Sequence, residues 1–304
     1  MGLGTNNFGA RMDAQQSERV VRQAVESGIT LIESSNSYGN GLSEEYIGKA
    51  IQGIRDKLIV ATKVSSAIGT GPNQRGTSRK HILTELDKAL KRFGTDYIDL
   101  YQIHRPDTRT PVEEMMRTLD DLVHQGKVRY IGCSNFPAWQ VAEAIFTSKM
   151  LNLESFISVQ PEYSMLNRDA EKELIPFCRK YGLGVLPYYP LASGFLTGKY
   201  RRGEPLPAGT RLAGRPAAQN EQVLSDKNFD LLERLESYAA QRGHTMVELA
   251  IAWLLATPAM GSVIAGATKP EQVVANAKAA DWQMTPEEKQ EVDRILAGEV
   301  HPRD

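Results

Sequence analysis

The amino-acid sequence predicts an α/β fold in which eight strands and their helices alternate and close into a (β/α)8 TIM barrel. Strand-like and helix-like segments alternate along almost the whole chain. The strand-like segments are apolar without alternation, as strands covered on both faces are. A length of 304 residues suits such a barrel. A doubly wound open sheet is the alternative, but no Gly-x-Gly-x-x-Gly turn follows the first strand.

The predicted strands are short apolar runs, and the predicted helices at 13–27, 78–93 and 112–125 carry apolar residues at helical spacing. Strands are expected at residues 2–5, 30–34, 57–64, 97–103, 128–132, 156–160, 184–188 and 262–265. Helices are expected at residues 13–27, 43–51, 78–93, 112–125, 137–149, 169–181, 229–241, 246–256, 270–280 and 286–296.

Glycine and proline mark several boundaries. Gly28 and Gly94 follow predicted helices, as C-terminal caps do, and Pro176 predicts a kink in its helix. Segment 194–220 is rich in Gly, Pro and Arg and is too long for an ordinary connection. We therefore expect a functional lid or a flexible loop there, within one domain that spans residues 1–304.

Composition narrows the class of protein. The formal net charge is −1, which gives no indication of a nucleic-acid or membrane-surface partner. No apolar run approaches the length of a membrane helix, and the N-terminus lacks a signal-peptide pattern. The two cysteines, Cys133 and Cys178, lack metal-ligand spacing and are predicted to be buried thiols. These features favour a soluble cytoplasmic protein.

The predicted strands end in polar side chains. Active sites of such barrels lie at the carboxyl ends of the strands, so these side chains are expected to converge. Each alone has an ordinary structural explanation. Glu33 and Tyr38 could belong to a strand end and its turn, Lys63 could extend its ammonium to the surface, and His104 could be a hydrogen-bonded core residue. Together they predict a site, whose members are Glu33 and Tyr38, Lys63, His104, Ser134 and Asn135, Gln160, and Tyr188.

Four of these residue types suit the reduction of a carbonyl group. A tyrosine is a weak acid at neutral pH, and an adjacent ammonium, here that of Lys63, is expected to lower its pKa. The Glu33 carboxylate would hold Lys63 charged, and a neutral His104 could orient a carbonyl oxygen. No side chain supplies hydride, so a nicotinamide or similar cofactor is required. A metal hydrolase with His104 and Glu33 as ligands is the competing idea, but no second histidine lies near either residue; no metal site is predicted.

Five segments resemble, in the same order, the motifs of the aldo-keto reductase family, and the resemblance extends over essentially the whole chain. Among its branches the chain is similar to the bacterial proteins that resemble potassium-channel β-subunits. The segments are GITLIESSNSYG at 28–39 with Ser43-Glu44-Glu45 after it, DLYQIHRPD at 99–107, GKVRYIGCSNF at 126–136, YYPLASGFLTGKY at 188–200 and IAGAT at 264–268.

The resemblance implies a TIM barrel, an NADP(H) cofactor and reversible carbonyl reduction. By position, Tyr38 is the general acid, Lys63 modulates its pKa and His104 orients the carbonyl. The residues implied for cofactor binding are Ser134, Asn135 and Gln160 at the carboxamide, Tyr188 against the nicotinamide ring, Leu191, Ser193 and Lys199 with segment 194–220 at the pyrophosphate, and Gly266, Thr268, Gln272 and Asn276 near the adenosine. Lys269 is a candidate partner for a 2′-phosphate, but Ala267 stands at the usual serine position, so NAD(H) stays open.

The chain departs from the family pattern in two places. It begins at the first barrel strand, without the N-terminal hairpin that usually caps the barrel. Glu33 replaces the usual aspartate, and its longer side chain is still expected to contact Lys63. This replacement leaves three hypotheses: a working reductase, a cofactor-binding sensor or partner subunit with weak catalysis, and retuned chemistry such as alcohol oxidation or a non-redox step on a sugar-like substrate. The substrate pocket is expected from loops 67–75 and 107–110 and the C-terminal tail.

Overall fold

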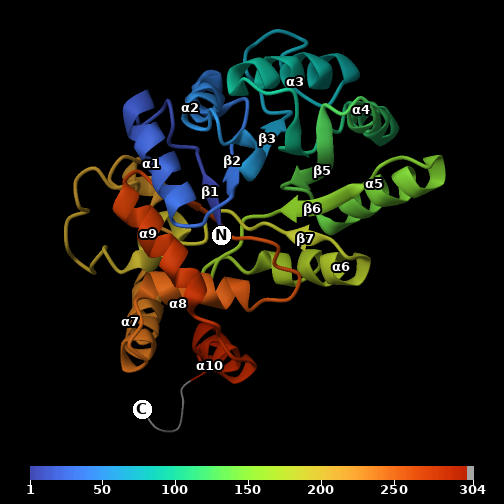
Figure 1. The fold of residues 1–304 in the computed structure, drawn as a ribbon. Helices are drawn as coiled ribbons and strands as arrows, with labels where there is room; N and C mark the ends of the chain where they lie inside the picture. Colours follow the sequence, from blue (N-terminus) through green and yellow to red (C-terminus); the bar gives the residue numbers. More distant parts are fainter. Residues whose placement is uncertain (300–304) are drawn as a thin grey trace.

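The computed structural model describes residues 1–299, and its strands and helices alternate as the sequence predicts (Figure 1). Within these residues, eight strands form one sheet in which every neighbouring pair is parallel. The strands are β1 (Gly2–Gly4), β2 (Leu31–Glu33), β3 (Ile59–Val64), β4 (Ile98–Ile103), β5 (Val128–Ser134), β6 (Phe156–Gln160), β7 (Gly184–Val185) and β8 (Ile264–Gly266).

The sheet curls until its two edge strands meet. Its order is β7-β6-β5-β4-β3-β2-β1-β8. Isolated parallel bridges join Val185 to Met260 and Tyr188 to Ile264. The amide of Ile264 donates to the Pro187 carbonyl at 2.9 Å across the same junction. These bonds between the two edges confirm the predicted (β/α)8 barrel and exclude the open doubly wound sheet.

Helices surround the strands in Figure 1. They are α1 (Ala14–Glu26), α2 (Leu42–Ala50), α3 (Arg79–Phe93), α4 (Val112–His124), α5 (Ala138–Leu151), α6 (Leu174–Tyr181), α7 (Asp226–Gln241), α8 (Met246–Leu255), α9 (Pro270–Lys278) and α10 (Pro286–Ala297). Local signals set several of these boundaries. Asp13 and Gln16 form a capping box at the start of α1. Gly94 ends α3 with φ 65°, a conformation that favours glycine.

Two elements near the middle of the chain differ from the prediction, each because of a proline. The predicted helix at 169–181 is not one kinked helix: a 3₁₀ turn (Asp169–Glu171) precedes α6, and Glu173 between them has φ −139°. The ring of Pro176 clashes with a helical carbonyl four residues earlier, so α6 begins only two residues before the proline. Strand β7 stops at Val185 since Pro187 has no amide hydrogen, and Tyr188 pairs only through isolated bridges.

The apolar core has an outer and an inner part. Most buried apolar side chains lie between the strands and the helices, including Val60, Tyr101 and Ile131. Cys133 and Cys178 are free and buried, as expected. A smaller cluster fills the barrel interior and consists of Leu31, Ala61, Leu100, Leu186 and Ile264. This inner cluster supports the side chains that follow it along the strands.

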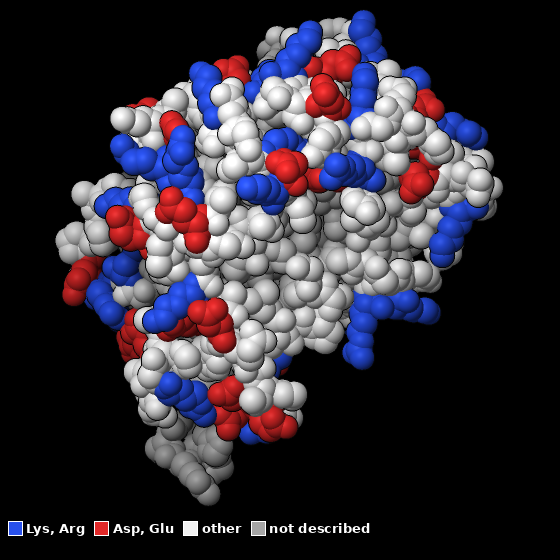
Figure 2. Space-filling model, viewed as in Figure 1, with Lys and Arg blue, Asp and Glu red and all other residues white. Residues whose placement is uncertain are grey.

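The molecular surface has mixed charge. On the face shown in Figure 2, Lys and Arg side chains alternate with Asp and Glu around the rim, and the centre is largely uncharged. This agrees with the net charge of −1. No helix within residues 1–299 is both long enough and apolar enough to cross a lipid bilayer.

Candidate active site

Polar side chains form the next layer above the inner apolar cluster. Leu31 and Ala61 belong to that cluster, and two residues further along the same strands stand Glu33 and Lys63. Because side chains alternate along a strand, these pairs face the barrel interior together. Above this layer opens a cleft of about 880 Å³, lined by strand ends and by the loops that follow them. Its volume suits a cofactor-sized ligand.

Lys63 connects Glu33 to Tyr38. Both Glu33 (3% exposed) and Lys63 (1% exposed) are buried. The Lys63 ammonium contacts the Glu33 carboxylate, and its Nζ donates to the Ser34 carbonyl at 3.1 Å and to the Tyr38 hydroxyl at 3.3 Å. Glu33 and Tyr38 line the cleft, while Lys63 lies behind them. The contact expected between Glu33 and Lys63 is therefore present.

Burial controls the protonation of this group. It raises the pKa of Tyr38 above its ordinary value, an effect that the charges of Arg105 and Arg211 partly oppose. Burial also lowers the pKa of Lys63 well below its ordinary value, and the contacting Glu33 carboxylate acts in the opposite direction. The sequence argument for a lowered Tyr38 pKa was wrong for this structure, because loss of hydration outweighs the nearby positive charges. Tyr38 keeps its proton at neutral pH, as a proton donor must.

His104 lies beside Tyr38 and is held by two serines. The Oγ atoms of Ser35 and Ser66 each lie 3.1 Å from its Nδ1 atom. Its ring meets the Tyr38 ring edge-on, with centroids 5.8 Å apart. Burial, followed by the positive charges of Lys63 and Arg105, lowers the pKa of His104 to about 3. The imidazole is therefore neutral at physiological pH.

Amide side chains line the cleft at the ends of β5 and β6. Asn135 is fully engaged: its Nδ2 donates to the His104 carbonyl at 2.9 Å, and its Oδ1 accepts from the Tyr188 hydroxyl at 2.8 Å. Ser134 Oγ donates to the Gln160 carbonyl at 2.8 Å. Gln160 Nε2 is buried without a hydrogen-bond partner among residues 1–299. A buried donor of this kind fits a ligand carbonyl, since leaving it unpaired costs free energy.

The other end of the cleft is polar and positively charged. All eleven residues predicted for cofactor binding line the same cleft as Tyr38. Seven of the eleven belong to this end of the cleft: Leu191, Ser193, Lys199, Gly266, Thr268, Gln272 and Asn276. Lys269 lines the cleft beside them and precedes the first turn of α9. Two lysines and a helix N-terminus at one end fit the phosphate groups of a dinucleotide.

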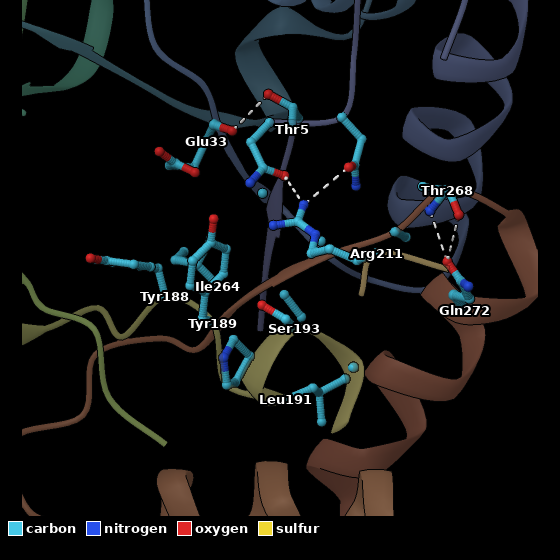
Figure 3. A pocket seen from close by; sticks show the side chains of 18 of the residues that line it. Thr5, Glu33, Tyr188, Tyr189, Leu191, Ser193, Arg211, Ile264, Thr268 and Gln272 are labelled. Atoms are coloured by element: carbon cyan, nitrogen blue, oxygen red, sulfur yellow. Dashed lines mark hydrogen bonds between the residues drawn. The ribbon is translucent and has the colours of Figure 1, made fainter. Parts of the chain in front are cut away.

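Arg211 is a cleft residue that the sequence prediction missed. Figure 3 shows its side chain between Tyr189 and the Thr268–Gln272 pair. Its guanidinium donates to Oδ1 of Asn6 and of Asn7, both at 3.1 Å, and lies 5.2 Å from the centre of the Tyr189 ring. The only sequence signal was the composition of segment 194–220, which did not distinguish among its arginines. Part of this segment does line the cleft, at Gly194, Thr197, Lys199 and residues 208–211.

The loops around Tyr38 also differ from the prediction. Ser66, Arg105 and Glu162 line the cleft, and the described parts of loops 67–75 and 107–110 do not. Asp107 instead joins loop 107–110 to the segment just after loop 67–75, because its carboxylate accepts from the Thr77 amide at 3.0 Å and from Arg109 Nε at 3.0 Å. Of the C-terminal tail, residues 300–304 lie outside the described part of the chain.

Comparison with known proteins gives consistent matches over nearly the full length. The model of the Aldo/keto reductase family matches residues 1–297. The rice (Oryza sativa subsp. japonica) protein named "Probable voltage-gated potassium channel subunit beta" is 36% identical over 300 residues, 95% of this chain and 90% of the relative. The "Uncharacterized oxidoreductase YrpG" of Bacillus subtilis (strain 168) is 36% identical over 307 residues, 97% and 91%. The "L-glyceraldehyde 3-phosphate reductase" of Escherichia coli O157:H7 is 34% identical over 307 residues, 97% and 88%.

Proposed function

Because the chain belongs to the aldo/keto reductase family, we propose that it catalyses the reversible reduction of small aldehydes or ketones with NADP(H). The observation that carries this proposal is the Tyr38 hydroxyl on the cleft wall with Lys63 Nζ 3.3 Å behind it. Its oxidoreductase relatives support the same class of reaction. A bound nicotinamide cofactor supplies the hydride, which no side chain of the protein can supply.

Tyr38 supplies the proton. Its raised pKa keeps the hydroxyl protonated until the carbonyl oxygen gains negative charge. When the proton leaves, the Lys63 ammonium stabilises the phenolate, and Glu33 in turn compensates the charge of Lys63. The three groups thus allow a phenol to act as an acid at neutral pH.

His104 orients the carbonyl oxygen. If one of the two hydroxyls, of Ser35 or Ser66, donates to Nδ1, the single proton of the neutral imidazole resides on Nε2. An Nε2–H group can then donate to the same carbonyl oxygen that receives the Tyr38 proton. Both donors would act on one oxygen, which fixes the orientation of the substrate.

The cofactor would be held along the length of the cleft. The unpaired Nε2 atom of Gln160 fits the oxygen of a carboxamide, and the cations at the opposite end fit phosphates. Lys269 is the cation we assign to a 2′-phosphate, which favours NADP(H) over NAD(H). The cytoplasm, where this cofactor is abundant, is the location we propose, with residues 1–304 acting as one domain.

The test is NADPH oxidation with a panel of aldehydes and ketones, using Tyr38→Phe and the wild-type protein. Loss of the proton donor is expected to lower kcat by on the order of 10²- to 10⁴-fold. Fluorescence titration should still show NADPH binding, because the ring remains. Tyr130→Phe is the matched control, since Tyr130 is 56% exposed and does not line the cleft. Unchanged turnover of the Tyr38 variant would refute the proposal.

A cofactor-binding regulatory subunit is the second candidate. It is favoured by the 36% identity to the rice protein named as a potassium-channel β-subunit. The same experiment separates the two candidates. Tight NADPH binding without oxidation by any carbonyl compound of the panel would replace the reductase with this regulatory role.

A further inference from the structure

The backbone of His104 and Arg105 is fixed beside the Tyr38 hydroxyl. Ser65 Oγ bridges both backbone groups of Arg105: it accepts from the amide and donates to the carbonyl, each at 2.9 Å. The His104 amide donates to the Val64 carbonyl at 2.7 Å. Ser65 itself has φ 109°, a value rarely adopted by residues other than glycine. Strained backbone of this kind often marks a position with a function.

The Arg105 side chain, by contrast, forms no hydrogen bond with the described residues 1–299. Its guanidinium lines the cleft and has no ion-pair partner within 4.0 Å in residues 1–299. The positive charge of Arg105 acts on both reacting groups. It lowers the pKa of His104, as burial does, and it partly opposes the increase in the pKa of Tyr38 that burial causes. Arg109, four residues along the same loop, pairs with Asp107 at 3.0 Å. Arg105 thus brings an uncompensated cation to the carbonyl end of the cleft.

The neighbouring charged groups do not neutralise Arg105. The Glu33 carboxylate contacts Lys63, and Glu162, which lines the same end, forms no ion pair with Arg105 in the described chain. Arg211 is the other cation that acts on Tyr38, and its guanidinium already donates to two asparagines. An incoming anion would therefore meet Arg105 with its donors available.

We propose that the carbonyl substrate carries an anionic group, a carboxylate or a phosphate, and that Arg105 binds it. This inference rests on the proposed reductase function. The planar guanidinium can donate two parallel hydrogen bonds to either anion. Since the Arg105 backbone is fixed relative to His104, an anion held there would set the distance from the bound group to the carbonyl that Tyr38 protonates. Arg105 would then select anionic aldehydes over neutral ones of the same length.

The experiment compares kcat/KM within two matched pairs of aldehydes. One pair is glyceraldehyde 3-phosphate and glyceraldehyde, and the other is 4-oxobutanoate and butanal. We expect the wild-type protein to prefer the anionic member of at least one pair, and the preferred pair identifies phosphate or carboxylate. Arg105→Met should lower the anionic-to-neutral ratio by roughly 10- to 100-fold, mainly through KM, as expected for loss of a charge-assisted hydrogen bond.

Two further variants control this result. Arg109→Met removes a cation from the same loop outside the cleft and should keep the wild-type ratio, while Arg105→Lys should recover part of the preference. Equal use of anionic and neutral aldehydes by the wild-type protein, or an unchanged ratio in Arg105→Met, would overturn the assignment and leave the reductase function intact. Absence of turnover with every aldehyde, neutral and anionic, is the distinct result that would remove both.

Discussion

Replacing His104 by asparagine should make the folded protein less sensitive to acid. The pKa of His104 is about 3 in the folded protein, against 6.5 for an ordinary histidine. Between these values the unfolded chain binds a proton that the folded protein does not. The free energy of unfolding is therefore highest above pH 6.5. It decreases as the solution is acidified, until the pH reaches the pKa that His104 has in the folded protein.

The size of this effect follows from the two pKa values. Each pH unit between them costs about 1.4 kcal/mol of stability. Between pH 7.5 and pH 5.0, about 1.5 pH units lie below the ordinary pKa of 6.5. Titration of His104 therefore lowers the free energy of unfolding by about 2 kcal/mol over this interval. His104→Asn lacks the titrating group and should lose about 2 kcal/mol less than the wild-type protein over this interval. All other titrating groups contribute equally to both proteins and cancel in the difference.

Urea denaturation, followed by circular dichroism, measures the free energy of unfolding of the wild-type protein and of His104→Asn, each at pH 7.5 and pH 5.0. Any constant cost of the substitution cancels too, because only the change with pH is compared. His124→Asn serves as the control, since His124 is exposed on α4 and its pKa is raised by Asp120. Equal losses in the wild-type protein and His104→Asn would show that burial does not keep His104 neutral, and would refute the reasoning.

Two further predictions concern charges in and near the cleft. Glu33→Gln should lower the free energy of unfolding by about 3 kcal/mol, because it leaves the buried Lys63 ammonium uncompensated. The control is Glu18→Gln, since Glu18 forms an exposed pair with Arg22, and it should change the free energy of unfolding little in the same denaturation series. Equal effects of the two substitutions would contradict this prediction. Lys269→Met should weaken NADPH binding by roughly tenfold and NADH binding far less; titration of both cofactors measures this, and equal loss for the two would exclude a 2′-phosphate contact.

The arrangement of the strand ends was predictable because it depends on local rules alone. An apolar run such as residues 58–62 identifies a buried strand, and the polar residue that ends it must lie at the carboxyl edge of a parallel barrel. The alternation of side chains then brings Glu33 and Lys63 to the same face. For this reason Glu33, Tyr38, Lys63 and His104 could be grouped from the sequence, and the structure does bring them together.

The loops around the cleft could not be predicted in the same way. Arg105 and Arg211 enter the cleft because of backbone bonds and side-chain partners that lie far away in the sequence, such as Ser65 and Asn6. The pKa of Tyr38 was misjudged for a related reason. The sequence shows which charges are near but not how completely the phenol is removed from water, and burial is the larger effect.

The bonds that join the two walls of the cleft have a consequence for folding. Arg11 Nη2 donates to the Gly209 carbonyl at 2.7 Å across 198 residues of sequence, and Arg211 reaches Asn7 across 204. Such contacts pay a large loop-closure entropy and are expected late in folding, after the neighbouring strands have paired. The part of the cleft with Tyr38 and Lys63 can thus form before the cofactor end is covered. NADPH affinity during refolding would then report the final step of assembly, the contact between residues 7–11 and residues 209–211.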